Sequence, residues 1–300
     1  MNDSFETKRI IFRKYFPIIE NNMWLNHAAH GPWSIRSLEA MRKYSETYCL
    51  GPMLDYTVCD AEIAKTRTLM ASFLGASFEE IGFNYNTSLT LILFGRMIKW
   101  QPGDNMIVPD RCFPSIIMPA RLFEQWGVER RMIKPVDGLI DENALLGAID
   151  KKTKFMIVPL VNFLTGQRLD VKRISDECKR AGVFLAVDAI QGAGAIKIDV
   201  NNLGCHALCF GSPKWMFGPM GVGTFYIDHE ILNDLLVPQA GMNSVVDPWN
   251  FFDYDQQFLN DCRRFECGCQ MHLAHFGLNP NLEMFLDLGP ENTEKYLLEL

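Results

Sequence analysis

Short apolar runs alternate with longer amphipathic stretches through the middle of this 300-residue chain. Apolar runs of this length, bounded by turn residues, are typical of buried β-strands. Seven such runs are found, at residues 81–85, 106–108, 128–133, 154–160, 183–187, 207–210 and 222–227. Between them lie helical patterns at residues 87–98, 115–125, 142–149 and 171–181.

This alternation predicts an α/β fold, a three-layer α/β/α sandwich with a mainly parallel seven-stranded sheet covered on both faces. The helical pattern at 171–181 is the clearest, because Val171, Ile174 and Cys178 share one face and Gly182 follows its end. Ligands bind to such sheets at the carboxyl ends of the strands, so residues directly after each strand are candidates for a site.

Charge and hydropathy exclude several classes of protein. The chain has 29 basic and 36 acidic residues, a net charge of −7, which argues against nucleic acid as the main partner. No apolar run approaches the roughly 18 residues of a membrane-spanning helix, and charges interrupt the first 16 residues, where a signal peptide needs an apolar core. Membrane insertion and secretion are therefore not expected.

Nine scattered cysteines indicate a reducing compartment, because an odd number at irregular spacing is not a disulfide framework. We therefore expect a cytoplasmic protein. Metal ligation is an alternative for two close pairs, Cys205/Cys209 and Cys267/Cys269. Their spacings do not match each other and no histidine cluster accompanies them, so the sequence predicts core thiols and no metal site.

The residues richest in chemistry lie between 183 and 227. Asp188 ends an apolar strand, where a carboxylate needs a cationic or hydrogen-bonding partner, and Gln191 follows three residues later. Lys214 lies after the next strand, inside the apolar and glycine-rich segment GSPKWMFGPMGVG. Such a setting favours a Schiff-base lysine with a lowered pKa, and the alternative is a loop lysine that extends over apolar surface.

Taken together, strand-Asp-x-x-Gln and strand-x-x-x-Lys-Trp-x-x-Gly-Pro-x-Gly-x-Gly resemble the class V aminotransferases, a family of fold-type I pyridoxal 5′-phosphate (PLP) enzymes. That family includes cysteine desulfurases, isopenicillin N epimerase-like proteins and kynureninase. The resemblance extends from Trp24 to the Arg264-Phe-Glu-x-Gly region. It implies an N-terminal segment at 1–24, a PLP-binding large domain at 25–260, and at 261–300 a connector and the start of an incomplete C-terminal small domain. A helical pattern still running at Leu300 predicts a truncated chain.

The resemblance also implies roles for individual residues. Lys214 would hold PLP as an internal aldimine and shuttle the substrate Cα proton. Asp188 would keep the pyridine nitrogen protonated, and Gln191 would hydrogen-bond the phenolic oxygen O3′ of PLP. Thr87 and Ser88, between a strand and a helix, would bind the phosphate.

Further candidates complete the implied site. Ser212 would be another phosphate ligand, and Phe113 would stack on the cofactor ring. On the substrate side the resemblance suggests Asn26, His27 and Asn162. The chain departs from the family pattern at Leu89, Thr90, Phe163, His206, Pro213 and Cys269.

The implied function is that of a PLP-dependent enzyme acting on a small amino acid, by lyase, desulfurase-like, epimerase or transaminase chemistry. It would be a homodimer with the active site at the subunit interface. The departures motivate an alternative, a catalytically silent PLP-fold protein that serves as a binding or assembly partner. A nucleotide-binding Rossmann site at Gly192-Ala-Gly194 is excluded, because no third glycine follows at the required spacing.

Overall fold

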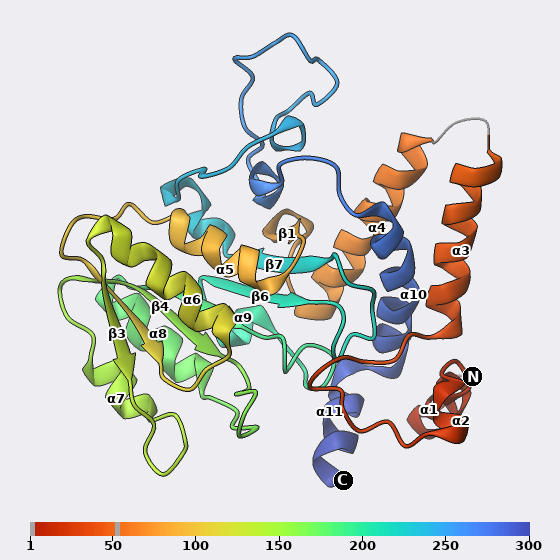
Figure 1. Ribbon diagram of the computed structural model, residues 1–300, viewed down its shortest axis with the longest axis horizontal. Helices are drawn as coiled ribbons and strands as arrows, with labels where there is room; N and C mark the ends of the chain where they lie inside the picture. The colour runs from red at the N-terminus through yellow and green to blue at the C-terminus, as the bar shows by residue number, and fades with distance from the viewer. Residues whose placement is uncertain (1–3, 52–54) are drawn as a thin grey trace.

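A seven-stranded sheet forms the centre of the molecule (Figure 1). The computed structural model describes residues 4–51 and 55–300. The strands are β1 (Ile81–Asn84), β2 (Asn105–Pro109), β3 (Glu129–Ile133), β4 (Thr153–Pro159), β5 (Phe184–Asp188), β6 (Ala207–Gly211) and β7 (Gly223–Ile227). Their order is β1-β7-β6-β5-β4-β2-β3, and β7 runs antiparallel to both neighbours while the remaining pairs are parallel. The predicted seven-stranded, mainly parallel sheet is confirmed.

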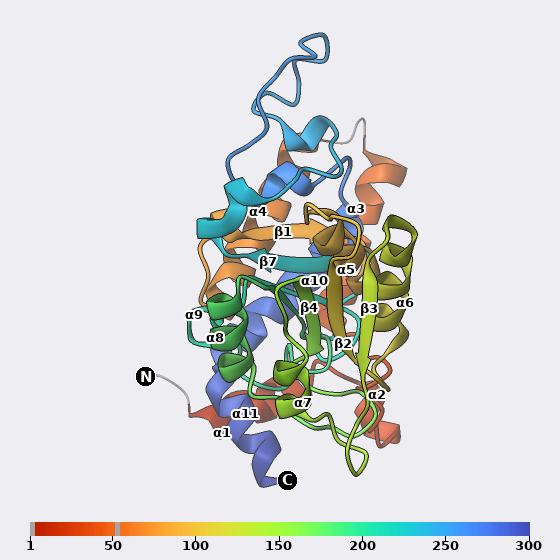
Figure 2. The ribbon, with the colours of Figure 1, turned by 90° about the vertical axis from the view of Figure 1, so that its left-hand side faces the viewer.

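Helices cover both faces of the sheet, as the alternating pattern predicts (Figure 2). One face carries α5 (Thr87–Arg96) and α6 (Pro114–Phe123), and the other carries α7 (Glu142–Gly147), α8 (Val171–Ala181) and α9 (Val200–Leu203). The four predicted helices are all present, with ends that differ by at most a few residues. Helix α8 follows its sequence signals: Asp170 caps its N-terminus and Gly182, with φ 68°, closes it.

The remaining helices lie near the two ends of the chain. The sequence patterns predict only the last of them. They are α1 (Phe5–Arg13), α2 (Ile18–Asn21), α3 (Ile35–Leu50), α4 (Tyr56–Leu74), α10 (His272–Leu288) and α11 (Pro290–Glu299). Short 3₁₀ turns lie at Phe78–Glu80, Glu124–Trp126, His229–Asp234, Met242–Ser244 and Cys262–Phe265. Helix α10 packs on α3 and α4 beside the β1 end of the sheet (Figure 1).

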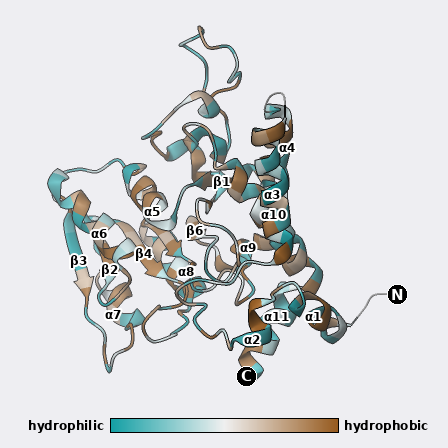
Figure 3. Cartoon of the chain, turned by 45° about the vertical axis from the view of Figure 1, so that its right-hand side comes forward, coloured by the Kyte–Doolittle hydropathy of each residue, from teal (hydrophilic) through white to brown (hydrophobic). Residues whose placement is uncertain are grey.

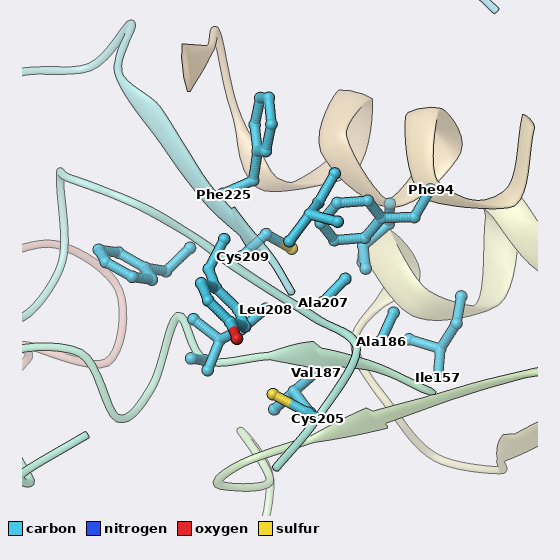
Figure 4. Close-up of a cluster of buried hydrophobic side chains, with 14 of the residues drawn as sticks. Phe94, Ile157, Ala186, Val187, Cys205, Ala207, Leu208, Cys209 and Phe225 are labelled. Atoms are coloured by element: carbon cyan, nitrogen blue, oxygen red, sulfur yellow. The ribbon is translucent and has the colours of Figure 1, made fainter. Parts of the chain in front are cut away.

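The core lies between the central strands and the helices above them (Figure 4). Phe94 of α5 and Phe225 of β7 are fully buried and meet edge to face. The outer strand β3 instead begins with Glu129 and two arginines, as its hydrophilic colouring in Figure 3 shows. Charged side chains at a sheet edge discourage pairing with another chain.

The prediction that both close cysteine pairs are core thiols is correct for one pair and wrong for the other. Cys205 and Cys209 are buried core thiols, as expected, but Cys267 and Cys269 are exposed. These two lie between the last 3₁₀ segment and α10, in a stretch without regular secondary structure. Within residues 4–51 and 55–300, no cluster of three potential metal ligands is found. In the same part of the chain, no helix is long and apolar enough to cross a membrane.

A buried ion pair ties α4 to the segment before α10. The Arg67 guanidinium lies 2.9 Å from the Glu266 carboxylate, and both side chains are at most 4 % exposed. Glu266 also accepts the backbone N–H of Phe83 at 2.8 Å, and Arg67 donates to the carbonyl of Ile81. The pair therefore joins α4, β1 and the C-terminal part of the chain at one buried point.

Replacing Glu266 with glutamine is expected to lower the free energy of unfolding by about 3 kcal/mol, because the buried Arg67 charge loses its partner. Urea denaturation would measure this. Asp176→Asn is the matched control, since Asp176 pairs with Lys172 at 2.5 Å and both side chains are about half exposed. That exposed pair should be worth less than about 1 kcal/mol. Equal losses in the two variants would contradict the assignment of a buried, structurally important pair.

Candidate active site

The carboxyl ends of three neighbouring strands converge on one cavity. Asp188 ends β5, Pro159 ends β4, and Lys214 lies three residues after β6. The cavity is lined by Cys112, Phe113, Ile116, Pro159, Val161, Asn162, Phe163, Asp188, Ile190, Gln191 and Lys214. The topological rule for parallel sheets thus places five of the sequence-predicted residues around a common space.

Asp188 is a buried carboxylate without a charged partner. It is 3 % exposed, and one oxygen accepts the backbone N–H of Ile190 at 3.0 Å. Burial raises its pKa to about 6, while the hydrogen bond from Ile190 and the charge of Lys214 act in the opposite direction. Among the described residues, no cation lies within 4 Å of this carboxylate. The site therefore favours a cationic ligand beside Asp188.

Lys214 is half-buried next to Asp188. Burial lowers the pKa of its ammonium group, and the negative charge of Asp188 partly opposes this shift. Its Nζ lies 5.2 Å from the centre of the Phe113 ring. A lysine with a lowered pKa has a larger neutral fraction, which is what nucleophilic attack on an aldehyde requires.

Two aromatic rings cover Lys214 from the solvent side. Phe113 and Phe163 meet edge to face with ring centres 5.3 Å apart, and each is 41 % exposed. The space left in the cavity is only about 10 Å³, because Phe113 lies over the Lys214 ammonium. Both rings border solvent, and a flat ligand would have to displace Phe113 to reach Lys214.

Gln191 makes two hydrogen bonds to the protein. Its Nε2 donates to the carbonyl of Ala28 at 3.0 Å, and its Oε1 accepts from the indole N–H of Trp215 at 2.9 Å. His27 stacks on the same Trp215 with ring centres 5.2 Å apart. Gln191 therefore joins the N-terminal loop to the segment of Lys214, and its predicted bond to O3′ of PLP stays a prediction.

The other substrate-side candidates have local structural partners. Asn162 is buried, and its Oδ1 accepts the backbone N–H groups of Leu164 and Thr165. Asn26 is exposed, and its carbonyl closes the turn that precedes His30. Asn162 lines the cavity together with Lys214, and His27 is in contact with Trp215, the residue after Lys214. Cys112 and Ile116 were not singled out in the sequence, although both line the cavity.

The predicted phosphate ligands surround the start of α5. Thr87 is its first residue, and the Thr87 hydroxyl is buried without a hydrogen-bond partner among the described residues. A Cβ added to Gly211, at the end of β6, would lie 3.5 Å from that hydroxyl. Ser88 is hydrogen-bonded to Ser115 at 2.7 Å, and Ser212 donates to the carbonyl of Pro219. Of the three candidate phosphate ligands, Thr87 is thus the one whose hydroxyl has no hydrogen-bond partner among the described residues.

His206, which stands where the family has aspartate, has a structural role here. Its Nδ1 accepts the backbone N–H of Leu185 at 3.0 Å, and its ring stacks on Phe184. Burial lowers its pKa to about 4, so the ring is neutral at physiological pH and acts as an acceptor. The substitution therefore leaves the strand that carries Asp188 well supported.

These features fit PLP. The carboxylate of Asp188 lacks the cation that a pyridinium nitrogen supplies, and Lys214 has the lowered pKa of an imine-forming lysine. The orphaned Thr87 hydroxyl at a helix N-terminus suits a phosphate. The half-exposed ring of Phe113 suits a stacking partner.

Replacing Thr87 with valine is expected to weaken PLP binding about tenfold, because a hydrogen bond to a charged group is worth about 1.5 kcal/mol or more. The free protein should keep its stability or gain some, since the buried hydroxyl has no partner to lose. Thermal unfolding with and without PLP would measure both effects. Thr90→Val is the control, because Thr90 is buried on the same helix and bonds only to Asn86. A normal PLP affinity in Thr87→Val would remove Thr87 from the phosphate site.

Comparison with known proteins agrees with this geometry. The family model for aminotransferase class V matches residues 24–300. An uncharacterized aminotransferase of Schizosaccharomyces pombe is 28% identical over 96% of this chain and 75% of its own length. The apo structure of a cysteine desulfurase from Thermococcus onnurineus has a TM-score of 0.80 and 26% identity, over 91% of this chain and 69% of the other.

A third relative was solved with its cofactor. The structure of a C-DES variant, in which glycine is covalently linked to PLP, has a TM-score of 0.85 and covers 95% of this chain and 76% of the other. At 23% identity this similarity shows the fold. The chain thus spans 69 to 76% of the length of these proteins.

Proposed function

Since the chain belongs to the class V aminotransferase family, whose cofactor is PLP, we propose that it is an enzyme acting at the Cα atom of a small amino acid. The observation that carries this proposal is the pairing of Asp188 and Lys214 across one cavity, each with a pKa shifted by burial. Titratable groups whose pKa is perturbed by burial beside a charged partner, inside a cavity, are candidates for a functional site.

The roles follow from the chemistry of each group. When bound, PLP supplies an electron sink that stabilises negative charge at Cα. Lys214 would hold the cofactor and, once released, accept and return the Cα proton through its neutral amine. Asp188 would stay ionised against the pyridinium nitrogen. Thr87 would bind the phosphate, and Phe113 would cover the ring.

Transaminases, epimerases and β-lyases all remove the Cα proton of the substrate. Removal of this proton is therefore the step that we propose for this chain. Phe113, Phe163 and Asn162 line the space beside Lys214, where the substrate would meet the cofactor. Cysteine is included among the candidates, since the T. onnurineus relative is a cysteine desulfurase.

Exchange of the Cα hydrogen for deuterium tests the proposal. Purified protein loaded with PLP would be incubated in D₂O with single small amino acids, including cysteine, alanine and serine, and followed by NMR. Exchange with at least one of them, absent without PLP, is the expected result. Bound PLP with no exchange and no product from any amino acid would instead favour the silent assembly partner.

We also propose a cytoplasmic homodimer. The segment between Leu235 and Asp261 extends from the body of the protein (Figure 1) and exposes several aromatic side chains, among them Phe252 at 85 % and Tyr254 at 84 %. Apolar side chains gathered on a protruding segment are typical of contact surfaces. All nine cysteines are free, which suits a reducing compartment. Analytical ultracentrifugation showing a stable monomer at micromolar concentration would contradict the dimer.

A further inference from the structure

A buried asparagine on α10 is hydrogen-bonded to the loop that carries Lys214. Asn281 is 1 % exposed, and its Nδ2 donates to the carbonyl oxygens of Phe217 at 2.8 Å and Met216 at 3.4 Å. Its Oδ1 accepts from the hydroxyl of Ser34 at 2.8 Å. The amide is therefore bonded on both sides, to the start of α3 and to the Lys214 loop.

The bonded carbonyl belongs to a residue in a strained conformation. Phe217 has a φ of 55°, in the left-handed region that residues other than glycine rarely occupy. Such a conformation costs free energy and persists only where its surroundings hold it. The Phe217 ring stacks on Phe285 of α10 at 5.5 Å and meets Phe16 and His27 edge to face. Asn281 holds the backbone of the same residue, because it binds the Phe217 carbonyl.

The position of Phe217 determines that of Lys214. The backbone N–H of Phe217 donates to the Lys214 carbonyl at 3.1 Å, which closes a tight turn between them. On the other side Gly31 donates to the carbonyl of Pro213 at 2.8 Å, and a Cβ at Gly31 would lie 2.3 Å from the Lys214 carbonyl. The Lys214 backbone is thus held between Gly31 and the Asn281–Phe217 hydrogen bond.

From these contacts we propose that Asn281 is a positioning residue for Lys214, acting through the carbonyl of Phe217. The inference rests on the proposed role of Lys214 as the lysine that holds PLP. Asn281 itself does not line the cavity. Helix α10, which packs on α3 and α4 away from the catalytic edge, thereby fixes the geometry of the site.

The experiment measures how fast Lys214 becomes linked to added PLP. Asn281→Leu keeps the branching of the side chain but removes both the donor to Phe217 and the acceptor for Ser34 and Ser37. Apo protein would be mixed with PLP, quenched with borohydride at intervals, digested, and the labelled peptide quantified. We expect labelling of Lys214 to slow about 100-fold, as for a displaced catalytic group. The pH at which the absorption band of the linked cofactor titrates should also shift.

Asn279→Leu is the matched control. Asn279 lies on the same helix, is fully buried, and donates to the Glu62 carboxylate at 2.7 Å, with no contact to the Lys214 loop. It should lose stability in urea as Asn281→Leu does, yet label Lys214 at the wild-type rate. If Asn281→Leu does not fold, Asn281→Ala removes the same amide and should show the same slow labelling.

Two outcomes would overturn the positioning role while leaving the proposed function intact. One is wild-type labelling in a folded Asn281 variant, and the other is an equal slowing in the Asn279 control. Labelling of a lysine other than Lys214 in the wild-type chain would overturn the proposed function and the positioning role together.

Discussion

Replacing Lys214 with alanine is expected to abolish the covalent link to PLP and to slow turnover by about 10³-fold or more. A positioned acid–base group alone contributes about 10²- to 10⁴-fold, and here the same side chain would also hold the cofactor. Lys214 is the residue for this double role because its ammonium is half-buried beside Asp188 and its pKa is lowered.

Borohydride labelling and steady-state kinetics would check this expectation. In the wild-type protein, reduction should bleach the visible band and attach the cofactor to the peptide that contains Lys214. Lys214→Arg is the informative companion variant, because it keeps a cation near Asp188 but has no amine that condenses with an aldehyde. Both variants should lose the band and the activity. Full turnover in either one would exclude Lys214 as the cofactor lysine.

The sequence predicts the sheet and the place of the site for the same physical reason. Buried parallel strands are nearly continuous apolar runs, so a polar residue at the end of one, such as Asp188, stands out. Strand ends meet at one edge, which brings Asp188, Phe113 and Lys214 together although up to about a hundred residues separate them in the chain. Local pattern and topology therefore agree.

Most helices near the ends of the chain cannot be predicted from the pattern of apolar residues. Helix α10 buries His275, Asn279 and Asn281, so polar residues interrupt the apolar stripe that would identify it. Each of these side chains makes a hydrogen bond to a residue far away in the sequence, such as Thr66 for His275. The same is true of Gln191, whose bonds to Ala28 and Trp215 depend on the tertiary structure. Sequence patterns do not contain these pairings.

The exposure of Cys267 and Cys269 likewise depends on a contact between residues far apart in the sequence. The sequence predicts core thiols for Cys267 and Cys269, and the neighbouring Phe265 is indeed buried. Glu266, however, points inward to Arg67, and the chain then turns along the surface, which leaves Cys267 and Cys269 outside. A long-range ion pair thus decides which way the segment faces.

Replacing Asp188 with asparagine is expected to affect catalysis and stability in opposite directions. Without the carboxylate, the pyridine nitrogen of bound PLP loses the partner that keeps it protonated, so exchange at Cα should slow by about 10³-fold. The free protein, in contrast, should become more stable at neutral and higher pH. The reason is that a buried carboxylate without a cation is costly to ionise.

The sign of the stability effect follows from the direction of the pKa shift. Burial raises the pKa of Asp188 from 3.8 to about 6, so the folded protein holds this proton more tightly than the unfolded chain. The stability that the protonated form contributes is complete below about pH 4 and is lost as the pH rises through about 6. A shift of two units corresponds to about 3 kcal/mol. At pH 8, apo Asp188→Asn should therefore exceed the wild type by up to that amount, and at pH 4 the difference should vanish.

Urea denaturation at pH 4 and pH 8, with and without PLP, separates these contributions. PLP brings a cation to Asp188, so saturating cofactor should stabilise the wild type at pH 8 far more than the asparagine variant. The order of stability should then reverse between the apo and the loaded proteins. Asp110→Asn is a suitable control, because Asp110 follows β2 outside the cavity and its carboxylate bonds only to the next backbone N–H. If the asparagine variant at position 188 is no more stable than the wild type at pH 8, Asp188 is not an unpaired buried charge. The case for a pyridinium partner at that position would then fail.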